Sequence, residues 1–390
     1  MALADFKAPA LAGTVATVTG LAASSSVVLA AFKALRATTE QATSGFVVMI
    51  SLYGLLSIIL SWKFKMPISV VWSTPGAALL VAAGGLGLSF ASATGAFIVT
   101  GLLFALTGLW PALGRLVGSI PRPIASAMLA GVIFPFCVAP FVSLKDYPLI
   151  IAPVLIVWLI LYKFAPLWAS PVAVGLLFTL IAITTKINVA EEHLLPTLQF
   201  VAPEFSWAAV IGIAIPLYLV TMASQNVPGI AIMKSFGYEV PFRPVLSTIG
   251  FTTVFGAFFG GWALNLAAIT AAINANEHAH KDPKKRWMAA AIGGVWFQVL
   301  ALFAGVTVAF VLDAPKVLVL AAAGVALFAT MVSALSTTVE STEHRLPAVI
   351  TFLVGASGVA LFSIGAAFWA LLAGLLVLGW LRLRVGSKSA

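Results

Sequence analysis

Apolar stretches of up to about twenty residues recur along the whole chain, and short segments with charged residues, glycine or proline separate them. A helix rises about 1.5 Å per residue, so roughly 20 apolar residues cross the hydrocarbon core of a bilayer. The pattern therefore predicts an all-α polytopic membrane protein with fourteen membrane-spanning segments. These predicted spans are 10–31, 44–62, 68–83, 90–111, 122–143, 147–162, 166–185, 206–228, 244–260, 262–275, 287–311, 316–336, 346–362 and 364–381.

Two of these spans, 68–83 and 262–275, are too short to cross the bilayer as straight helices. The first contains the sequence Ser-Thr-Pro-Gly at 73–76, and the second follows a Gly-Gly pair and contains Asn265. Groups that interrupt a helix are tolerated at membrane depth only where protein or a cavity surrounds them. We therefore expect spans 3 and 10 to be short broken helices.

Segments of the two halves resemble each other in the same order. Residues 23–27 resemble 223–227, an offset of 200, and residues 72–82 resemble 262–272, an offset of 190. A repeat of seven spans, an odd number, must insert upside down relative to its partner. The chain is therefore predicted to contain 7+7 inverted repeats, a plan in which transporters bind substrate near the midplane, where broken helices meet.

The charged residues add one point to this prediction, namely the orientation of the chain in the membrane. With 62% hydrophobic and 8% charged residues, the chain is far from a soluble domain, which carries about 25% charged residues. If the N-terminus is cytoplasmic, the inner segments hold 16 of the 21 basic residues, as the positive-inside rule requires. The net charge of +9 thus indicates that both termini are cytoplasmic, and not that nucleic acid binds. The basic residues of the predicted outer loops are Lys33, Arg36, Lys145, Lys186 and Lys316.

Polar residues inside the spans mark a candidate site. Serines occupy 24–26 of the first span, and Gln225 and Asn226 occupy the matching place in its repeat mate. Buried amides are costly unless they are paired or face a cavity. The N-terminus of a half-helix offers unpaired N–H donors and a partial positive charge, so two facing ends bind an anion without arginine. The predicted substrate-binding residues are Ser24, Ser25, Trp72, Ser73, Thr74, Pro75, Gly76, Gln225, Asn226, Asn265, Leu266 and Ala267.

Aromatic residues close to these positions favour a substrate with an apolar body. Trp72, Trp262 and Tyr53 are placed to line an aromatic-tolerant pocket, which together with the helix ends suits a small carboxylate. Purely structural roles stay open for the same residues. The serines of the first span can serve interhelical hydrogen bonds, and the tryptophans can serve packing or anchoring at the membrane interface. Isolated Gln298 is interpreted as a packing contact.

Enzymatic chemistry finds little support in the sequence. The four histidines lie in predicted loops, and Glu277, His278 and His280 are interpreted as a solvated turn and not as a metal site. No GxxxxGK[ST] pattern occurs, which argues against ATP hydrolysis by this chain. The single cysteine, Cys137, excludes an intrachain disulfide and a cysteine metal cluster. We expect no enzyme activity, no cofactor and no metal.

Two long motifs, 72–80 and 219–229, are quite specific in sequence. By these motifs the chain resembles the benzoate:proton symporter family, the BenE-type benzoate permeases, and the similarity runs from about residue 8 to residue 382. The resemblance implies proton-coupled import of benzoate across a bacterial inner membrane. It also implies distant kinship with uracil/xanthine permeases and sulfate-type anion carriers. Shorter similar segments are 267–273, 286–291, 356–358 and 366–369.

The same resemblance implies an elevator-type carrier with a core and a gate domain. The core would hold residues 8–111 and 206–311, and the gate residues 112–205 and 312–382. A homodimer through the gate is expected by analogy alone.

The sequence departs from the uracil-type relatives in one respect that bears on the proton. Those relatives place glutamates in spans 8 and 10, where this chain offers Gln225, Asn226 and Asn265. One hypothesis is that the substrate carries the proton itself. A carboxylic acid has a pKa of about 4 in water, and desolvation raises it.

Two classes of function remain at this point. The first is a secondary carrier for an aromatic carboxylate, and the second is a passive anion channel or an exchanger on the same scaffold. Saturable uptake that accumulates substrate against a gradient separates them, because a channel cannot concentrate its ion. Without the resemblance, the residues alone indicate only a small anion or a polar solute.

Overall fold

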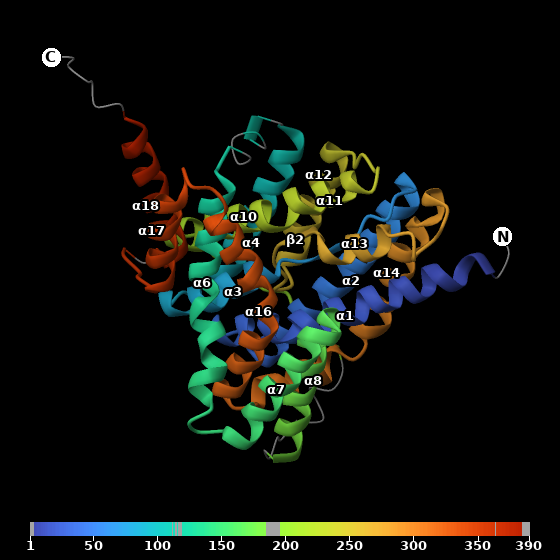
Figure 1. Cartoon of the computed structure of the whole chain (residues 1–390), viewed down its shortest axis with the longest axis horizontal. Helices are drawn as coiled ribbons and strands as arrows, with labels where there is room; N and C mark the ends of the chain where they lie inside the picture. Colours follow the sequence, from blue (N-terminus) through green and yellow to red (C-terminus); the bar gives the residue numbers. More distant parts are fainter. Residues whose placement is uncertain are drawn as a thin grey trace.

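A computed structural model describes residues 4–110, 112–113, 115, 119–184, 196–362 and 364–383. The chain folds into a bundle of helices, and α1 and α18 extend from it at the two ends of the chain (Figure 1). The elements of the first half are α1 (Ala4–Ala34), α2 (Thr39–Phe64), β1 (Val70–Trp72), α3 (Thr74–Ala83), η1 (Gly84–Leu86), α4 (Phe90–Leu109), α6 (Arg122–Ser143), α7 (Pro148–Phe164) and α8 (Pro166–Thr184). The elements of the second half are α9 (Trp207–Ala209), η3 (Val210–Ala214), α10 (Ile215–Thr221), η4 (Met222–Asn226), α11 (Val227–Ser235), α12 (Phe242–Ala257), β2 (Leu264–Leu266), α13 (Ile269–Ala275), η5 (Pro283–Lys285), α14 (Trp287–Ala301), α15 (Ala304–Asp313), α16 (Lys316–Glu340), α17 (Arg345–Ala356) and α18 (Ala366–Arg382).

The described residues contain seven helices that are long and apolar enough to cross a bilayer, or eight if the bent pair α14–α15 counts as one span. Shorter apolar helices are formed by α7, α17, α18 and the continuous unit of α3 and η1. Each of the fourteen predicted spans overlaps a helix or a strand–helix unit. Their number as membrane crossings stays a prediction.

The predicted span 287–311 is not one straight helix. It is divided into α14 and α15, whose axes differ by 61°. The end of α15 is fixed on α1, because the ammonium group of Lys33 donates hydrogen bonds to the carbonyl oxygens of Leu312 (2.7 Å) and Ala314 (2.8 Å). The sequence gives no warning of this bend, because no proline lies at the break.

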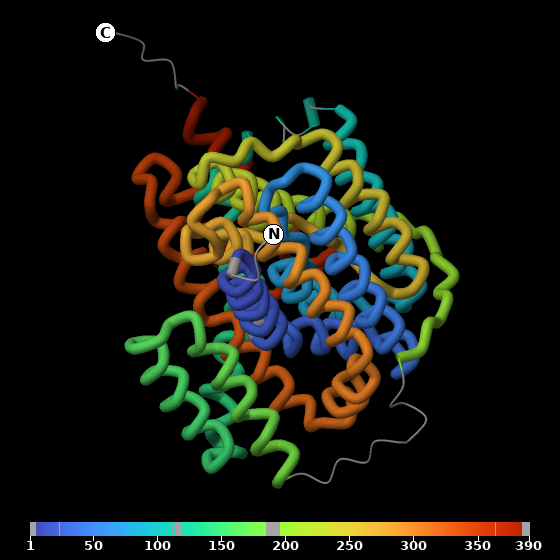
Figure 2. The backbone as a smooth tube through the Cα atoms, turned by 90° about the vertical axis from the view of Figure 1, so that its right-hand side faces the viewer, coloured from blue at the N-terminus to red at the C-terminus, as the bar shows by residue number. Residues whose placement is uncertain are grey.

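Helices from the two halves are interleaved. Helix α4 packs along α12, α2 along α14, and α6 along α16 and α17, as the tube in Figure 2 also shows for the blue and orange helices. Small residues allow the closest approach: a Cβ added at Gly250 of α12 would clash with the backbone of Ala105 on α4. Such close backbone contacts are typical of helix packing in membranes. The halves therefore do not form separate units.

The contacts instead divide the helices into two groups that each draw on both halves. One group contains α1–α4 together with α9–α15, and the other contains α6–α8 together with α16–α18. Contacts between the groups run mainly through α1, which touches α8 and α16, and through α3, which touches α6.

The all-α expectation is wrong in one place, and that place is central. Each predicted broken helix begins as a three-residue strand, and β1 pairs antiparallel with β2. Val70 lies opposite Leu266, Val71 opposite Asn265, and Trp72 opposite Leu264. The physical reason is that a half-helix leaves the preceding backbone without intrahelical partners. Two such segments side by side satisfy each other's N–H and C=O groups.

Candidate functional site

The pairing of β1 with β2 sets the geometry of the candidate site. Two further backbone bonds extend the ladder, from Ser73 N–H to the oxygen of Ala263 (3.0 Å) and from Ala267 N–H to the oxygen of Ser69 (2.9 Å). Because the strands are antiparallel, α3 and α13 leave the ladder in opposite directions. The N-termini of both half-helices thus start at one crossing in the middle of the bundle, where Figure 1 shows β2.

The N-terminus of α3 is largely closed by the protein itself. The hydroxyl oxygen of Ser73 accepts from Gly76 N–H (3.0 Å), and the backbone oxygen of Ser73 accepts from Ala77 N–H (2.7 Å). Pro75 has no N–H to offer. Thr74 is half-buried, and its N–H has no hydrogen-bond partner among the described residues. The first turn of α3 therefore presents one free backbone donor.

Helix α10 packs directly on this closed end. The hydroxyl of Thr221 donates to the hydroxyl oxygen of Ser73 (2.7 Å), and both residues are completely buried. At Gly76 an added Cβ would lie 2.5 Å from a methyl group of Leu217. An added Cβ would push the Leu217 side chain aside, so glycine allows α3 to pack closely against α10 at this point. Thr221 was not among the predicted site residues, although it lies within the 219–229 motif.

The N-terminus of α13 is open by comparison. Its first intrahelical bond runs from Ala272 N–H to the oxygen of Ala268 (3.1 Å). Among the described residues, the N–H groups of Ala268, Ile269, Thr270 and Ala271 have no acceptor. Ile269 is 69% exposed. This end of the crossing therefore combines free backbone donors with an accessible apolar side chain.

The predicted amides lie beside this open end. Asn226 is completely buried, and its Oδ1 accepts from Leu266 N–H in β2 (2.9 Å). Asn265 Nδ2 donates to the oxygen of Leu266 (2.9 Å), while its Oδ1 is buried without a hydrogen-bond partner in the described part of the chain. Gln225 is half-buried, and its amide bonds to no other described residue. Of the three amides, Asn226 positions β2, and Gln225 is the one whose side chain has no hydrogen bond to another described residue.

Gln225 and Asn226 belong to η4, a turn of π-helix between α10 and α11. A π-turn is rare and widens the helix locally, and such turns are frequent at functional sites. The wider turn lets Asn226 reach β2 while the helix continues through Pro228 at the start of α11. Sequence spacing that assumes a regular helix does not show this change of register.

Ser24, Ser25 and Trp72 serve internal contacts. The indole N–H of Trp72 donates to the hydroxyl of Ser24 (2.8 Å), which itself donates to the oxygen of Gly20 (2.7 Å). Ser25 is half-buried, and its hydroxyl donates to the oxygen of Leu21 in its own helix (2.6 Å). The bond between Trp72 and Ser24 ties β1 to α1, in line with the interhelical alternative for Ser24, whereas the bond of Ser25 stays within α1.

The two tryptophans pack in aromatic clusters and are not equivalent in the fold. Trp72 is the last residue of β1 and stacks on Phe46 (5.4 Å between ring centroids), whereas Trp262 precedes β2 and lies 4.5 Å from Phe32. Both indoles are at most 3% exposed. The strands themselves are related by an offset of 194, so the offset of 190 does not align these segments.

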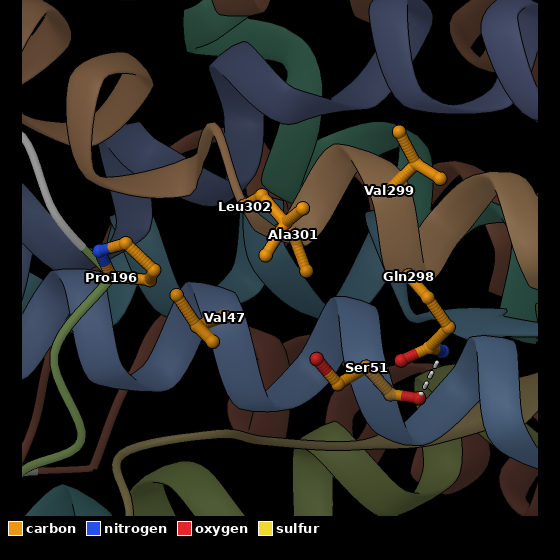
Figure 3. Close-up of a pocket in the computed structure, with 7 residues that line it drawn as sticks. All are labelled: Val47, Ser51, Pro196, Gln298, Val299, Ala301 and Leu302. Carbon is orange, nitrogen blue, oxygen red and sulfur yellow. Dashed lines mark hydrogen bonds between the residues drawn. The ribbon is translucent and has the colours of Figure 1, made fainter.

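The isolated amide Gln298 lies away from this crossing. Its Nε2 donates to the backbone oxygen of Ser51 in α2 (2.8 Å), as Figure 3 shows. A lateral pocket of about 450 Å³ lies beside that bond, where α14 ends. The side chains that line it are Val47, Ser51, Pro196, Gln298, Val299, Ala301 and Leu302. The bond agrees with the interpretation of Gln298 as a packing contact.

Charge is kept to the ends of the elements around the crossing. Arg286, which is 8% exposed, donates to the oxygens of Ala275 (2.8 Å) and His280 (2.7 Å) and so caps the far end of α13. Within the described ranges, no group of three or more His, Cys, Asp or Glu side chains is placed to hold a metal ion. Backbone N–H groups and neutral side chains make up the site.

The apolar spans, the paired half-helices and the site of neutral donors together define a polytopic membrane transport protein. The chain belongs to the BenE family, whose description is benzoate membrane transport protein, with a match over residues 4–380. It is 38% identical over 370 residues to the inner membrane protein YdcO of Escherichia coli, covering 93% of each chain. It is 35% identical over 324 residues to the benzoate membrane transport protein of Acinetobacter baylyi, covering 82% of this chain and 81% of that protein.

Solved structures support the fold at much lower sequence identity. The transmembrane domain of the cyanobacterial bicarbonate transporter BicA matches with a TM-score of 0.63 and 15% identity, covering 96% of this chain and 98% of that one. SLC26A9 matches with a TM-score of 0.56 and 14% identity, covering 96% of this chain and 66% of that one. The chain thus has the fold of these transporters, and its two relatives are named as an inner membrane protein and as a membrane transport protein, not as enzymes.

Proposed function

We propose that the protein is a secondary active transporter that imports benzoate, or a similar small aromatic carboxylate, together with a proton. The observation that carries this proposal is the open end of α13, where four consecutive N–H groups have no acceptor among the described residues. Free N–H groups at the start of a helix bind an anion without a basic side chain. The family and the relative named for benzoate support this choice of anion.

In this proposal the carboxylate binds the N–H groups of Ala268–Thr270, and Thr74 contributes the one free donor of α3. The free amide of Gln225 supplies a further hydrogen bond from η4. The exposed side chain of Ile269 contacts the aromatic ring. The remaining predicted residues hold this arrangement: Ser24, Ser25, Trp72, Ser73, Pro75, Gly76, Asn226, Asn265, Leu266 and Ala267.

The proposal includes fourteen spans in 7+7 inverted repeats and an elevator-type movement. Both halves follow the same order of elements, and the strand–helix units β1–α3 and β2–α13 occupy the third place of each half. The two packing groups correspond to the proposed core, 8–111 and 206–311, and the proposed gate, 112–205 and 312–382. The boundary residue 111 lies outside the described residues, as do Lys186, Arg384 and Lys388 of the charge pattern.

We further propose that the protein lies in the bacterial inner membrane with both termini in the cytoplasm. The charge bias of the sequence and the relative named as an inner membrane protein support this placement. A homodimer through the gate belongs to the same proposal and rests on analogy.

The proton travels on the substrate in this proposal. The described residues that surround the crossing include no aspartate, glutamate or histidine side chain in contact with it. Benzoate loses its charge when it binds a proton, and desolvation in the site raises the pKa of the carboxyl group. Protonation therefore lowers the cost of moving the substrate through an apolar path.

Uptake of radiolabelled benzoate into proteoliposomes tests the proposal. We expect saturable accumulation above the outside concentration when the outside is made acidic, and loss of accumulation when a protonophore is added. Passive equilibration without accumulation would indicate a channel. Accumulation driven only by a counter-anion inside the vesicles would indicate an exchanger.

A further inference from the structure

The lateral pocket beside Gln298 lies away from the crossing and has no part in the proposed transport step. Its volume of about 450 Å³ is in the range of sites that bind organic ligands. The last turn of α14, one face of α2 and Pro196 form its walls, as Figure 3 shows. None of the described residues that line it is ionisable.

Two side chains present polar atoms to this pocket that have no partner among the described residues. The Nε2 of Gln298 donates to the backbone oxygen of Ser51 (2.8 Å), which fixes the orientation of the amide and leaves its Oε1 unpaired. The hydroxyl of Ser51 likewise makes no bond to a described residue. Both oxygen atoms lie on the side of Val47 and Ala301 in Figure 3. Together with the second hydrogen of Nε2, they give the pocket a small polar end with acceptors and donors.

An apolar strip leads away from this polar end along α2 and α14. The residues that follow each other at a spacing of four on one face of α2 are Val47, Ser51, Leu55 and Ile59. Leu55 and Ile59 are 47% and 43% exposed, and Val295 on the neighbouring α14 is 54% exposed. From Ser51 to Ile59 the strip is about 12 Å long, close to half the thickness of the hydrocarbon core. One acyl chain of a single leaflet therefore matches its length.

The depth of the pocket fits a molecule of the bilayer. Residues 196–206 are not helical, and irregular backbone does not face lipid within the hydrocarbon region. Pro196 therefore places the polar end of the pocket close to the headgroup region, and the apolar strip runs from there toward the middle of the bilayer. A lipid has its polar and apolar parts in this order.

The end of α14 favours one type of headgroup. The helix ends at Ala301, and the carbonyl groups of its last turn carry a partial negative charge. The backbone oxygen of Leu302, the next lining residue, accepts no backbone N–H of the described residues. Cations that donate hydrogen bonds are stabilised at such an end. An ammonium headgroup satisfies both conditions, whereas a quaternary amine has no hydrogen to donate.

We propose that this pocket binds a phospholipid with a primary ammonium headgroup, phosphatidylethanolamine. The ammonium group donates to Oε1 of Gln298 at the end of α14, and the hydroxyl of Ser51 donates to an oxygen of the phosphate or ester groups. One acyl chain lies on the strip of Leu55, Ile59 and Val295. The bound lipid supports the 61° bend between α14 and α15, which begins at this pocket. The inference does not depend on which substrate the protein carries.

Native mass spectrometry of the purified full-length protein with equimolar pairs of phospholipids tests this inference. The lipids share the same acyl chains, and methylation leaves three, two, one or no hydrogen atoms on the headgroup nitrogen. We expect phosphatidylethanolamine to bind about tenfold or more tightly than phosphatidylcholine, because a hydrogen bond to a charged group is lost in the latter. The partly methylated lipids should lie between them. Equal binding across the series, or a preference for phosphatidylglycerol, overturns the inference.

Two variants locate the preference in this pocket. Gln298→Leu removes the acceptor and should reduce the preference to within about twofold. Val47→Trp fills the pocket and should reduce it likewise. The matched controls are Gln225→Leu at the crossing and Val332→Trp at a 49% exposed position of α16, and both should keep the preference of the unchanged protein. A preference that Gln298→Leu and Val47→Trp retain overturns the inference.

Thermal unfolding in vesicles gives a second measurement, which stays decisive if Gln298→Leu does not fold. The unchanged protein should unfold about 2 °C or more higher in phosphatidylethanolamine than in phosphatidylcholine. Ser51→Ala keeps the backbone oxygen that holds Gln298 and should lose part of this difference. An equal Tm in both lipids overturns the inference. A rise in Tm with benzoate that Val47→Trp removes would place the substrate in this pocket and would overturn it as well.

Discussion

The two half-helices begin at paired strands of equal length, yet their N-termini are completed differently. At α3, Ser73 closes the first turn and Thr221 holds Ser73 in place. At α13, four N–H groups have no acceptor among the described residues, and Ile269 is exposed. A nearly symmetric crossing thus has one structural end and one end suited to bind a ligand. Strand pairing supplies the rigid frame, and a few side chains decide which end is free.

Of the substitutions that test this difference between the two ends, Ile269→Glu should have the largest effect on benzoate uptake. A carboxylate tethered at the open end competes with substrate for the free N–H groups at an effective concentration in the millimolar range. We expect benzoate uptake in proteoliposomes to fall about tenfold or more, with an unchanged Tm because the site is exposed. Ile269→Gln is the neutral control, and Thr74→Glu at the closed end should lower uptake much less. Equal loss at both ends would contradict the assignment of one binding end.

Substituting Asn226→Leu should remove the hydrogen bond that positions β2 at the open end of α13. The change leaves Leu266 N–H buried without an acceptor, which costs about 1–3 kcal/mol of unfolding free energy. Uptake should fall along with the Tm, since β2 positions α13. The control is Gln225→Leu, the same change at the next residue. We expect it to raise KM for benzoate while the Tm stays within about 2 °C, because the Gln225 amide holds no structural bond among the described residues.

Substituting Ser73→Ala should open the closed end at a moderate cost. Loss of the cap and of the acceptor for Thr221 is expected to lower unfolding free energy by about 1 kcal/mol, measured by chemical denaturation in detergent. The Kd of benzoate should change less than about threefold, since the carboxylate binds at α13. Ser73→Thr keeps the capping oxygen and serves as the control. A large loss of affinity with little loss of stability would place the substrate on α3 instead.

Substituting Ser25→Ala should have the smallest effect. The hydroxyl of Ser25 bonds within its own helix, so both Tm and uptake should stay close to those of the unchanged protein, within about 0.5 kcal/mol. Ser24→Ala removes the partner of the Trp72 indole N–H and should cost about 1 kcal/mol. A Ser25 variant with impaired uptake would show that the first helix contacts the substrate.

The broken spans could be predicted because their length and composition are local properties. Segments 68–83 and 262–275 are too short and too polar to be lipid-facing helices, whatever surrounds them. The antiparallel pairing of β1 with β2 could not be predicted in the same way. It depends on two segments separated by about 190 residues meeting in space, and a three-residue strand leaves no usable periodicity.

The candidate site shows the same limit at the level of single residues. The sequence identifies Ser73, Thr74 and Asn226 as polar groups in apolar surroundings, but not which of them is already bonded. Ser73 is satisfied by Gly76 and Thr221, whereas Gln225 is free of bonds to the described residues. Whether a polar side chain supports the fold or binds substrate depends on its hydrogen-bond partners. Those partners are set by the tertiary fold and not by the local sequence. The π-turn at η4 adds a second obstacle, because it changes which residues share a face.

The ladder between β1 and β2 also has a consequence for biogenesis. During synthesis, Val70–Trp72 leaves the ribosome long before Leu264–Leu266, so its backbone groups must wait for their partners. Unpaired backbone in hydrocarbon is costly, and the first half therefore cannot reach a stable state in the bilayer on its own. We therefore expect that this half-helix needs protection from lipid until the second half arrives, and that a chain interrupted between the halves is unstable in the bilayer.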